Sequence, residues 1–497
     1  MLKQKFIIDF AAKFGIQITT AVAGIIVARV AGPEVVGIIA YATSYVSIFL
    51  FIIGLFGSAH IKLVSEGQNE ADSLTTYSWL LGISSFVYLF IVLGMFLSQK
   101  FLMKNGFESI EIENVILIIL FSTLISAAYK YSATIFNAKT EQVKANLPEL
   151  LGTLINNILR VIVVVLGYGA IALAGVKVVG LLIGIPLIVY FLKNKEYGKF
   201  RSDLALKYVR IALPLLVVVI TNSIMMYSDK LILERIGNIR EIGIYTAAFS
   251  IGGIFILIGR TAGTVFFPLF SSYFAENNIA EVKRKIKQFE RFVFVFILPV
   301  IITLALFSYP VMVTLLGIKY EQSAPLFAVL VFSSFFAIWS MPYGNVISGL
   351  GLFWLSSLIN FMKFMVFLST LIVLIHPALF DMGAMALALT QLVMNIFLFL
   401  AYYIIAYRRI QIQFIKQQLK FGLFWSIIFI STYYFVLPEI NSYSVYIQSF
   451  IFIPIFLTFV FLLQFLIGLF HKSDLDMLLQ IIHPGRMMHY IKQELNK

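Results

Sequence analysis

The residues of this chain that could do chemistry are charged and polar side chains set at helical spacing inside long apolar stretches. In one stretch, Glu149, Thr153, Asn156 and Arg160 recur every three or four residues, so they would share one face of a helix. An ionisable group in an apolar helix is costly and rarely faces lipid. We therefore interpret such stripes as the lining of a polar path. The alternatives are that these residues join helices to one another or extend to the membrane surface from the helix ends, as we expect for Lys130.

The sign of the charge in these stretches indicates what such a path would accept. The cations are Lys13, Lys130, Arg160, Lys177, Lys230, Arg260 and Lys363. The acids are fewer, namely Asp9, Glu149 and Asp229. Cations in a low dielectric need a counter-charge, and an anionic passenger would supply it. Arginine suits phosphate because its guanidinium donates two parallel hydrogen bonds. We predict that the substrate-binding cations are Arg160, Lys230, Arg260, Lys363, Lys13 and Arg29.

Two acids are candidates for coupling transport to a proton or to Na⁺. Asp229 is deep in its apolar stretch, whereas Glu149 is near the predicted inner boundary. Burial and neighbouring cations act on such a carboxyl in opposite directions, so it could bind and release a cation. The alternative for Asp229 is a fixed counter-ion. Because neighbours on a helix point about 100° apart, Asp229 and Lys230 should each need another partner.

Other kinds of chemistry lack the residues that they need. The chain has no cysteine, which excludes disulfides, thiolate metal sites and cysteine nucleophiles. It has no phosphate-binding G-x-x-x-x-G-K-[ST] loop and no metal spacing among its five histidines. His60 and His376 are at predicted helix ends, where an interfacial place is expected. We predict no catalytic residue, no metal site and no cofactor, and a protein that is not an enzyme.

The elements that position these residues are apolar runs. Of 497 residues, 61% are apolar and 12% charged, and the mean hydropathy is +0.96, which excludes a soluble domain. Each crossing of a bilayer takes about 20 residues. The sequence therefore predicts an all-α polytopic membrane protein with about fourteen spans. The spans are expected near 6–31, 36–57, 77–98, 114–136, 147–167, 170–192, 211–235, 243–270, 290–314, 325–348, 354–376, 383–406, 421–438 and 445–469.

The distribution of Lys and Arg predicts the side of each connection. With both termini in the cytoplasm, most of the 37 Lys and Arg residues fall on inner segments, among them the polar linker 193–210 and a basic loop at 283–291. Anionic inner-leaflet lipid accounts for the net charge of +13, so no nucleic acid is needed. The outer connections are all short.

An internal repeat divides the chain. A shift of 206 residues superimposes segment 28–38 on 234–244 and pairs Arg29 with Arg235 and Gly37 with Gly243. The identities are few, so a chance match is the alternative. The repeat predicts two pseudo-symmetric six-helix lobes, 1–206 and 207–412, related by an axis along the membrane normal. Two further helices in 413–470 and an amphipathic cytoplasmic tail in 471–497 would follow.

Three segments carry a family resemblance. They are 28–38 (Ala-Arg-Val-Ala-Gly-Pro-Glu-Val-Val-Gly-Ile), 63–67 and 226–233 (Met-Tyr-Ser-Asp-Lys-Leu-Ile-Leu). With fourteen expected spans, they resemble the polysaccharide transporter family, which contains the O-antigen flippases of lipopolysaccharide biosynthesis. This family belongs to the multidrug/oligosaccharidyl-lipid/polysaccharide exporter superfamily.

The resemblance implies a substrate and a place. The substrate would be an undecaprenyl-pyrophosphate-linked oligosaccharide, moved by alternating access from the inner to the outer leaflet of a bacterial inner membrane. Its pyrophosphate would be the anion of the cationic cavity, and the last two helices would hold its polyprenyl tail. The implied partners are this lipid-linked oligosaccharide, membrane lipids, a coupling proton or sodium ion, and a polymerase of the same pathway.

Two other functions compete with a flippase. An ion-coupled multidrug antiporter of the same superfamily would extrude organic cations, for which an acidic cavity is expected, and the excess of cations argues against it. A membrane polysaccharide polymerase or ligase would need a substantial outer loop to hold sugars. The longest predicted outer connection, near 99–113, has only about fifteen residues.

Overall fold

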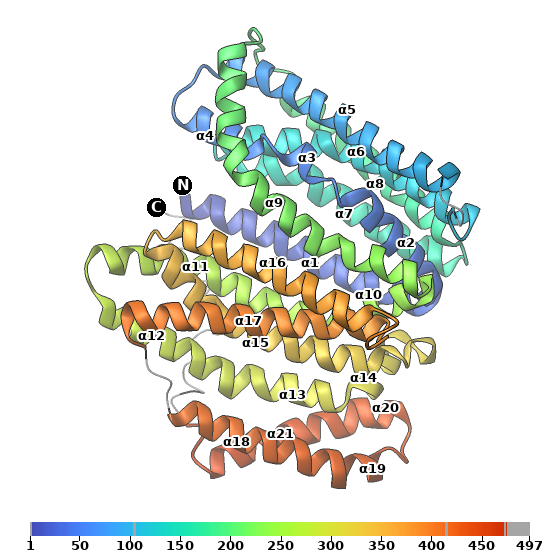
Figure 1. Cartoon of the computed structure of the whole chain (residues 1–497), viewed down its shortest axis with the longest axis vertical. Coiled ribbons are helices and arrows are strands. Elements are labelled where there is room, and N and C mark those ends of the chain that lie inside the picture. The colour runs from blue at the N-terminus through green and yellow to red at the C-terminus, as the bar shows by residue number, and fades with distance from the viewer. Residues whose placement is uncertain (1, 103–105, 413–415, 472–473, 475–497) are drawn as a thin grey trace. The chain divides into compact units, whose positions relative to one another are not determined.

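The computed structural model describes residues 2–102, 106–412, 416–471 and 474, and this part of the chain is helical without any strand (Figure 1). The side chains at 2–14, 215, 258, 260, 261, 264, 265, 416, 417 and 419 lie outside the description. The predicted amphipathic tail, 471–497, also lies outside it, except for His471 and Asp474.

The described helices are those of a multi-pass membrane protein. Eleven are long and apolar enough to cross a bilayer, and the bent pair Pro33–Ser47 and Phe51–Ser65 raises the number to twelve. Gly15–Ala31 and Phe266–Ala275 are apolar but shorter. Each predicted span overlaps a described helix or a run of consecutive helices, although the span expected at 243–270 is not among those long and apolar enough to cross a bilayer. The exact count of fourteen and the side of the termini stay predictions.

The chain divides into two compact units, the first of which ends at Gly243. Its helices are α1 (Leu2–Ala31), α2 (Pro33–Ser47), α3 (Phe51–Gly54), α4 (Gly57–Ser65), α5 (Glu70–Leu102), α6 (Ile110–Ala138), α7 (Gln142–Val165), α8 (Ala170–Leu192), α9 (Ser202–Ile236) and the beginning of α10 (Ile239–Gly252). Helix α1 packs on α7, α8 packs on α6 and α7, and α9 packs on α2, α4 and α5. The predicted lobe boundary at 206 stays a prediction.

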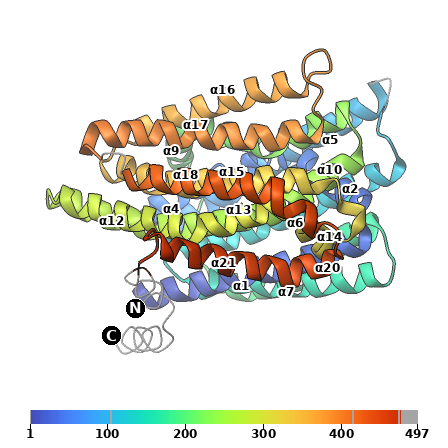
Figure 2. The ribbon, with the colours of Figure 1, turned by 90° about the horizontal axis from the view of Figure 1, so that it is seen from below.

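The second unit begins at Ile244, within α10. Its further helices are η1 (Gly253–Phe255), α11 (Ile256–Ala275), α12 (Ile279–Phe292), η2 (Val293–Ile297), α13 (Leu298–Leu306), α14 (Ser308–Leu316), η3 (Ile318–Tyr320), α15 (Ser323–Gly349), α16 (Phe353–Ile375), α17 (Ala384–Ile410), α18 (Lys416–Ser431), η4 (Thr432–Val436), α19 (Leu437–Ile440), α20 (Val445–Ile447), η5 (Gln448–Phe452) and α21 (Ile453–Leu466). Helix α15 packs on α11, α13, α14 and α17, and α13 packs on α18 and α21 (Figure 2).

Three π-helical turns in this unit have a common cause. Each one, η2, η4 and η5, comes directly before a helix whose second residue is proline, namely Pro299, Pro438 or Pro454. Proline has no N–H, and its ring clashes with the carbonyl group four residues earlier. A wider π turn gives that carbonyl group room, so the apolar helix continues across the bilayer with a local distortion.

The crossing of α2 and α10 agrees with the internal repeat. A Cβ atom on Gly37 would collide with the carbonyl oxygen of Ile239, and one on Gly243 would collide with that of Pro33. Ile239 follows Pro33 by 206 residues, as Gly243 follows Gly37. The contact is therefore reciprocal, as in two copies of one element related by a two-fold axis.

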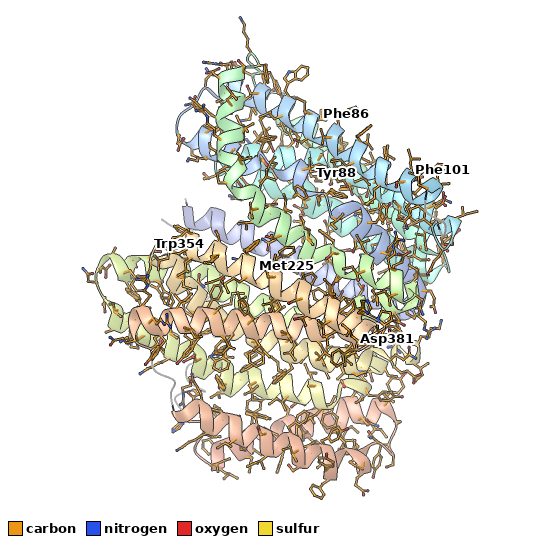
Figure 3. All side chains as sticks on the ribbon, viewed as in Figure 1. Phe86, Tyr88, Phe101, Met225, Trp354 and Asp381 are labelled. Atoms are coloured by element: carbon orange, nitrogen blue, oxygen red, sulfur yellow. The ribbon has the colours of Figure 1, made fainter. Side chains whose placement is uncertain are left out.

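The exposed faces of the helices are apolar, as a lipid environment requires. On α5, Phe86 and Phe101 are 70% and 71% exposed and point away from the ribbon, whereas Tyr88 is fully buried (Figure 3). Such a surface in water would be an aggregation hazard. In a bilayer it faces hydrocarbon, and only the buried face needs specific packing.

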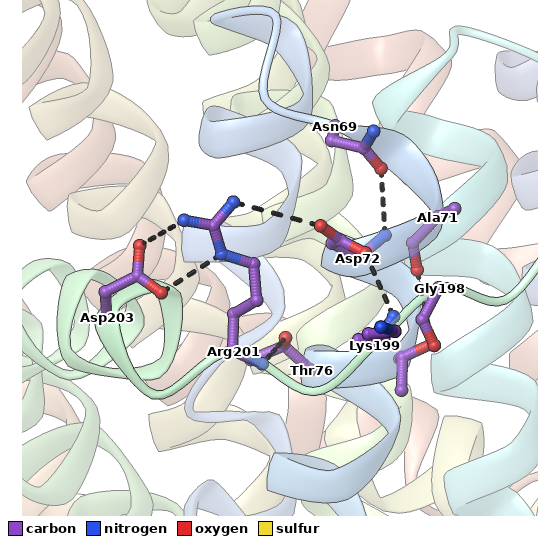
Figure 4. A network of polar contacts seen from close by, with 9 residues as sticks. Asn69, Ala71, Asp72, Thr76, Gly198, Lys199, Arg201 and Asp203 are labelled. Carbon is purple, nitrogen blue, oxygen red and sulfur yellow. Dashed lines mark hydrogen bonds and ion pairs between the residues drawn. The ribbon is translucent and has the colours of Figure 1, made fainter.

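The predicted linker 193–210 is partly helical, so the next helix begins before the span expected near 211–235. Helix α9 begins at Ser202, inside the polar stretch. The preceding residues are fastened to the start of α5 (Figure 4): Gly198 N–H donates to the Ala71 carbonyl, and Lys199 N–H donates to Asp72 Oδ1, both at 3.0 Å. The polar composition of this stretch therefore reflects a docked connection followed by the first turns of a helix.

Candidate functional site

Two cations of the first unit, Arg160 on α7 and Lys177 on α8, lie half-buried on two helices that pack on each other. Their helices pack almost backbone to backbone, since a Cβ atom on Gly152 would lie 2.8 Å from the carbonyl oxygen of Gly180. Within the described part of the chain, neither cation forms an ion pair or a hydrogen bond with an acid. The pair is therefore a site of positive charge that lacks a counter-charge among the described side chains.

An amide side chain on the same helix as Arg160 joins α7 to α1. Asn157, which is 4% exposed, donates from Nδ2 to Thr19 Oγ1 at 3.3 Å and to Thr20 Oγ1 at 3.1 Å, which ties α7 to α1. Sequence reasoning placed Asn156 on the polar stripe but missed Asn157. The signal was present as two consecutive amides in an apolar helix. Glu149, at the other end of the stripe, is exposed.

Asp229 and Lys230 pair with each other, although the angle between neighbours on a helix led us to expect another partner for each. Lys230 Nζ lies 3.2 Å from Asp229 Oδ1, and the backbone N–H of Lys230 donates to the same oxygen at 2.8 Å. The side chain of Asp229 is 5% exposed and that of Lys230 is 12% exposed. The long flexible lysine stem curls back across the 100° between the two Cβ directions, so the angle alone does not forbid the pair.

Lys363 is the predicted cation of the second unit whose side chain is described. It lies half-buried on α16, and it forms no ion pair within the described residues. One turn earlier, Asn360 Nδ2 donates to the carbonyl oxygen of Ser356 at 2.9 Å. The predicted polar stripe on this helix is therefore present, with its cation available for another partner.

The remaining predicted cations are Arg29, Lys13 and Arg260. Arg29 lies exposed in the last turn of α1, where the helix dipole favours a positive charge. The side chains of Lys13 and Arg260 lie outside the described residues. Next to Arg260, a Cβ atom on Gly259 would lie 3.1 Å from Met341 Cγ, so this face of α11 approaches α15 closely. The roles of all three cations stay predictions.

Glu290 is an acid that sequence reasoning missed. The predicted basic loop at 283–291 is the amphipathic helix α12, because Val282, Ile286 and Phe289 recur on one buried face. Glu290 lies on that face and is 3% exposed. A carboxylate at the spacing of the apolar residues was the available signal, and the surrounding Lys and Arg hid it.

His60 is buried, which corrects its expected interfacial place. It is 1% exposed in α4, and its Nδ1 lies 2.8 Å from the hydroxyl of Tyr208. Its ring stacks on Tyr77, with ring centroids 4.5 Å apart. His60 therefore holds α4, α5 and α9 together. Across the described residues, no cluster of three or more His, Asp or Glu side chains could hold a metal ion.

Comparison with known families decides the assignment. A family described as polysaccharide biosynthesis protein matches residues 26–325, which is more than half of the chain. The chain belongs to this family. The resemblance to polysaccharide transporters noted in the sequence is thereby confirmed. No curated protein matches the chain.

Solved structures show the fold. The lipid II flippase MurJ, in an inward closed conformation, is 16% identical with a TM-score of 0.68, over 93% of this chain and 99% of that one. An inward-facing multidrug resistance MATE family transporter of the MOP superfamily is 15% identical with a TM-score of 0.62, over 80% and 94%. A MOP superfamily transporter from Pyrococcus furiosus is 17% identical with a TM-score of 0.52, over 82% and 94%. The chain therefore has the fold of these transporters.

Proposed function

We propose that this protein is a flippase that moves an undecaprenyl-pyrophosphate-linked oligosaccharide from the inner to the outer leaflet of a bacterial inner membrane. The observation that carries the proposal is the pair of cations Arg160 and Lys177, which has no acidic partner in the described part of the first unit. A pyrophosphate supplies the missing negative charge, and the arginine fork fits its oxygens. Membership of a polysaccharide family supports a glycan as the rest of the passenger.

The division of the passenger into an anionic head and a hydrocarbon tail suggests how it crosses. The head moves through the cationic path as the lobes alternate, while the tail gains nothing by leaving lipid. The helices α18–α21 expose large apolar side chains such as Phe435, Phe450 and Leu466. We assign them the polyprenyl chain. Polar substitutions there should weaken the binding of a long-tailed substrate and spare a short-tailed analogue.

An antiporter for organic cations fits the site less well. Such a transporter needs an acid that is free to meet its substrate. Asp229, the acid deep in the first unit, already contacts Lys230. A cationic passenger would then face Arg160 and Lys177, and neither of them has a carboxylate partner among the described residues to offset the repulsion.

The test is transport of a lipid-linked oligosaccharide in liposomes, measured as the access of an external lectin to the sugar. Arg160→Glu and Lys177→Glu place a carboxylate where phosphate is expected. We expect each variant to reduce transport by about tenfold or more, and a tenfold loss corresponds to about 1.4 kcal/mol of interaction free energy. Arg160→Lys keeps the charge and should have a milder effect. Lys319→Glu, at an exposed position, is the matched control. Normal transport by both charge-reversed variants would refute the anion site.

Water access to the site can be measured separately. The chain has no cysteine, so a single cysteine at Arg160, Arg260 or Lys363 has no native background. Each cysteine should react with a small water-soluble thiol reagent in at least one conformation. If all three are inert in inward- and outward-facing preparations, these cations join helices and do not line a path.

A further inference from the structure

Three acids are buried in the described part of the chain, and Glu290 differs from the other two in its partners. Asp229 contacts Lys230, and Asp474 accepts hydrogen bonds from both Arg291 Nε and Arg291 Nη2. Glu290 is 3% exposed but forms no ion pair with any described cation. A carboxylate buried without a cation must be stabilised by neutral donors or take up a proton.

The donors around Glu290 come from two other helices. Trp339 Nε1 of α15 donates to Glu290 Oε1 at 2.9 Å, and the hydroxyl of Tyr343, one turn later, donates to the same oxygen. The amide of Gln418 on α18 also contacts this carboxyl. Glu290 thus joins α12, α15 and α18, and one of its oxygens remains available to Gln418.

Aromatic rings close the site to water. The ring of Trp339 stacks on Phe399 with centroids 4.0 Å apart, and Phe294 meets it edge-on at 4.9 Å. Phe294 also contacts Phe421 of α18, at 5.8 Å. This wall lowers the local dielectric, which makes an uncompensated charge costly. The carboxyl therefore lies in surroundings where its two protonation states compete.

Few charged groups face Glu290 from the elements around it. On α12, Lys287 is exposed, and Arg291 is engaged by Asp474, which His471 also approaches. Among the described side chains of the neighbouring helices, the titratable groups are Tyr343 on α15, Tyr273 on α11, Tyr402, Tyr403 and Tyr407 on α17, and the exposed cations Arg408 and Arg409 on α17 and Lys420 on α18. None of these supplies a buried positive charge to Glu290.

We propose that Glu290 is a proton-binding site whose occupancy controls how α18 is held against α12 and α15. The proton comes from water at the exposed, charged face of α12, forms an O–H bond with the carboxylate, and returns to water on release. Gln418 serves both states, because its amide can donate to the carboxylate or accept from the carboxyl group. Trp339 can only donate, so it keeps its bond to Oε1 in either state.

Infrared difference spectroscopy of the protein in lipid nanodiscs, stepped from acidic to alkaline pH, tests proton binding without any substrate. We expect the carbonyl band of a buried carboxyl group to appear and disappear with pH in the wild type. The band should be absent in Glu290→Gln and unchanged in Glu281→Gln, a matched control on the more exposed part of the same helix. A spectrum of Glu290→Gln identical to that of the wild type would overturn the proposal.

A second measurement tests the control of α18. Spin labels at Ile427→Cys on α18 and Leu400→Cys on α17 occupy exposed positions of the cysteine-free chain. We expect their distance distribution to change with pH, and Glu290→Gln to abolish that change. A titrating band with unchanged distances would overturn the control of α18. If Glu290→Gln does not fold, Tyr343→Phe should move the midpoint of the band, and an unmoved midpoint would contradict the site.

Because these experiments contain no oligosaccharide, their failure leaves the proposed flippase activity untouched. Loss of the anion site would likewise leave proton binding by Glu290 standing. The two proposals are therefore separable.

Discussion

The buried acids Asp229 and Glu290 are both 3% exposed and yet are compensated in different ways. Asp229, in the first unit, contacts the cation that follows it in the chain. Glu290, in the second unit, accepts hydrogen bonds from Trp339 and Tyr343, which are neutral. A paired carboxylate keeps its charge, whereas one held by neutral donors can exchange its proton at less cost. The partner of a buried acid therefore decides its role.

Breaking the Asp229–Lys230 pair should cause the greatest loss of stability. Asp229→Asn removes the carboxylate that a half-buried lysine contacts, so we expect the free energy of unfolding to fall by about 3–5 kcal/mol. The double variant Asp229→Asn/Lys230→Met should recover most of this loss, because no charge then remains uncompensated. Chemical denaturation in detergent micelles measures both. Equal stability of the single and double variants would break the comparison, since Asp229 would then not be a counter-ion.

The next largest loss of stability is expected for substitutions of Glu290. Glu290→Ala leaves the Trp339 N–H and the Tyr343 O–H buried without an acceptor, at a cost of about 1–3 kcal/mol for each donor. Glu290→Gln should lose less, because its amide oxygen still accepts both bonds. The same denaturation experiment distinguishes the two variants. If Glu290→Ala is as stable as Glu290→Gln, the hydrogen bonds from Trp339 and Tyr343 contribute little to the free energy of unfolding.

Transport under a proton gradient distinguishes the roles of the two acids. We expect any stimulation by the gradient to disappear in Glu290→Gln and to persist in Asp229→Asn/Lys230→Met. The ion pair of Asp229 favours a fixed counter-ion over the coupling role considered for it from the sequence. The measurement is the initial rate of lectin access in liposomes with and without an imposed pH difference. The reverse pattern would return the coupling role to Asp229.

The smallest effect is expected at an exposed pair. Arg201 Nη2 lies 2.8 Å from Asp203 Oδ2 and lowers the pKa of that carboxyl. A lowered pKa contributes stability above the unfolded pKa, and this is lost as the pH falls through the folded pKa. Because water and salt screen both groups, Arg201→Gln should not change the denaturation midpoint measurably at physiological salt. A large shift of the denaturation midpoint would show that burial does not explain why this pair contributes less stability than the Asp229–Lys230 pair.

Much of the fold could be predicted because apolar length is a local property. Each predicted span falls on described helices, since a stretch of about 20 apolar residues has few other places to go. The shift of 206 residues that suggested a repeat also relates the contacts of Gly37 and Gly243, while the repeat itself stays a prediction. The errors concern helix ends in polar stretches, as at Ser202 and in α12, where charge suggested a loop but one apolar face sufficed for a helix.

The amino-acid sequence alone predicts that this protein crosses a membrane many times, that polar and charged residues recur at helical spacing in its spans, and which family it resembles. Only the tertiary structure decided which charges are compensated. Asp229 meets its neighbour because a lysine stem is flexible, and Glu290 meets donors that are 49 and 53 residues away in the chain. Spacing along one helix shows which side chains share a face. The partner that a face meets depends on helices packed against it, and this contact sets the energy of a buried charge.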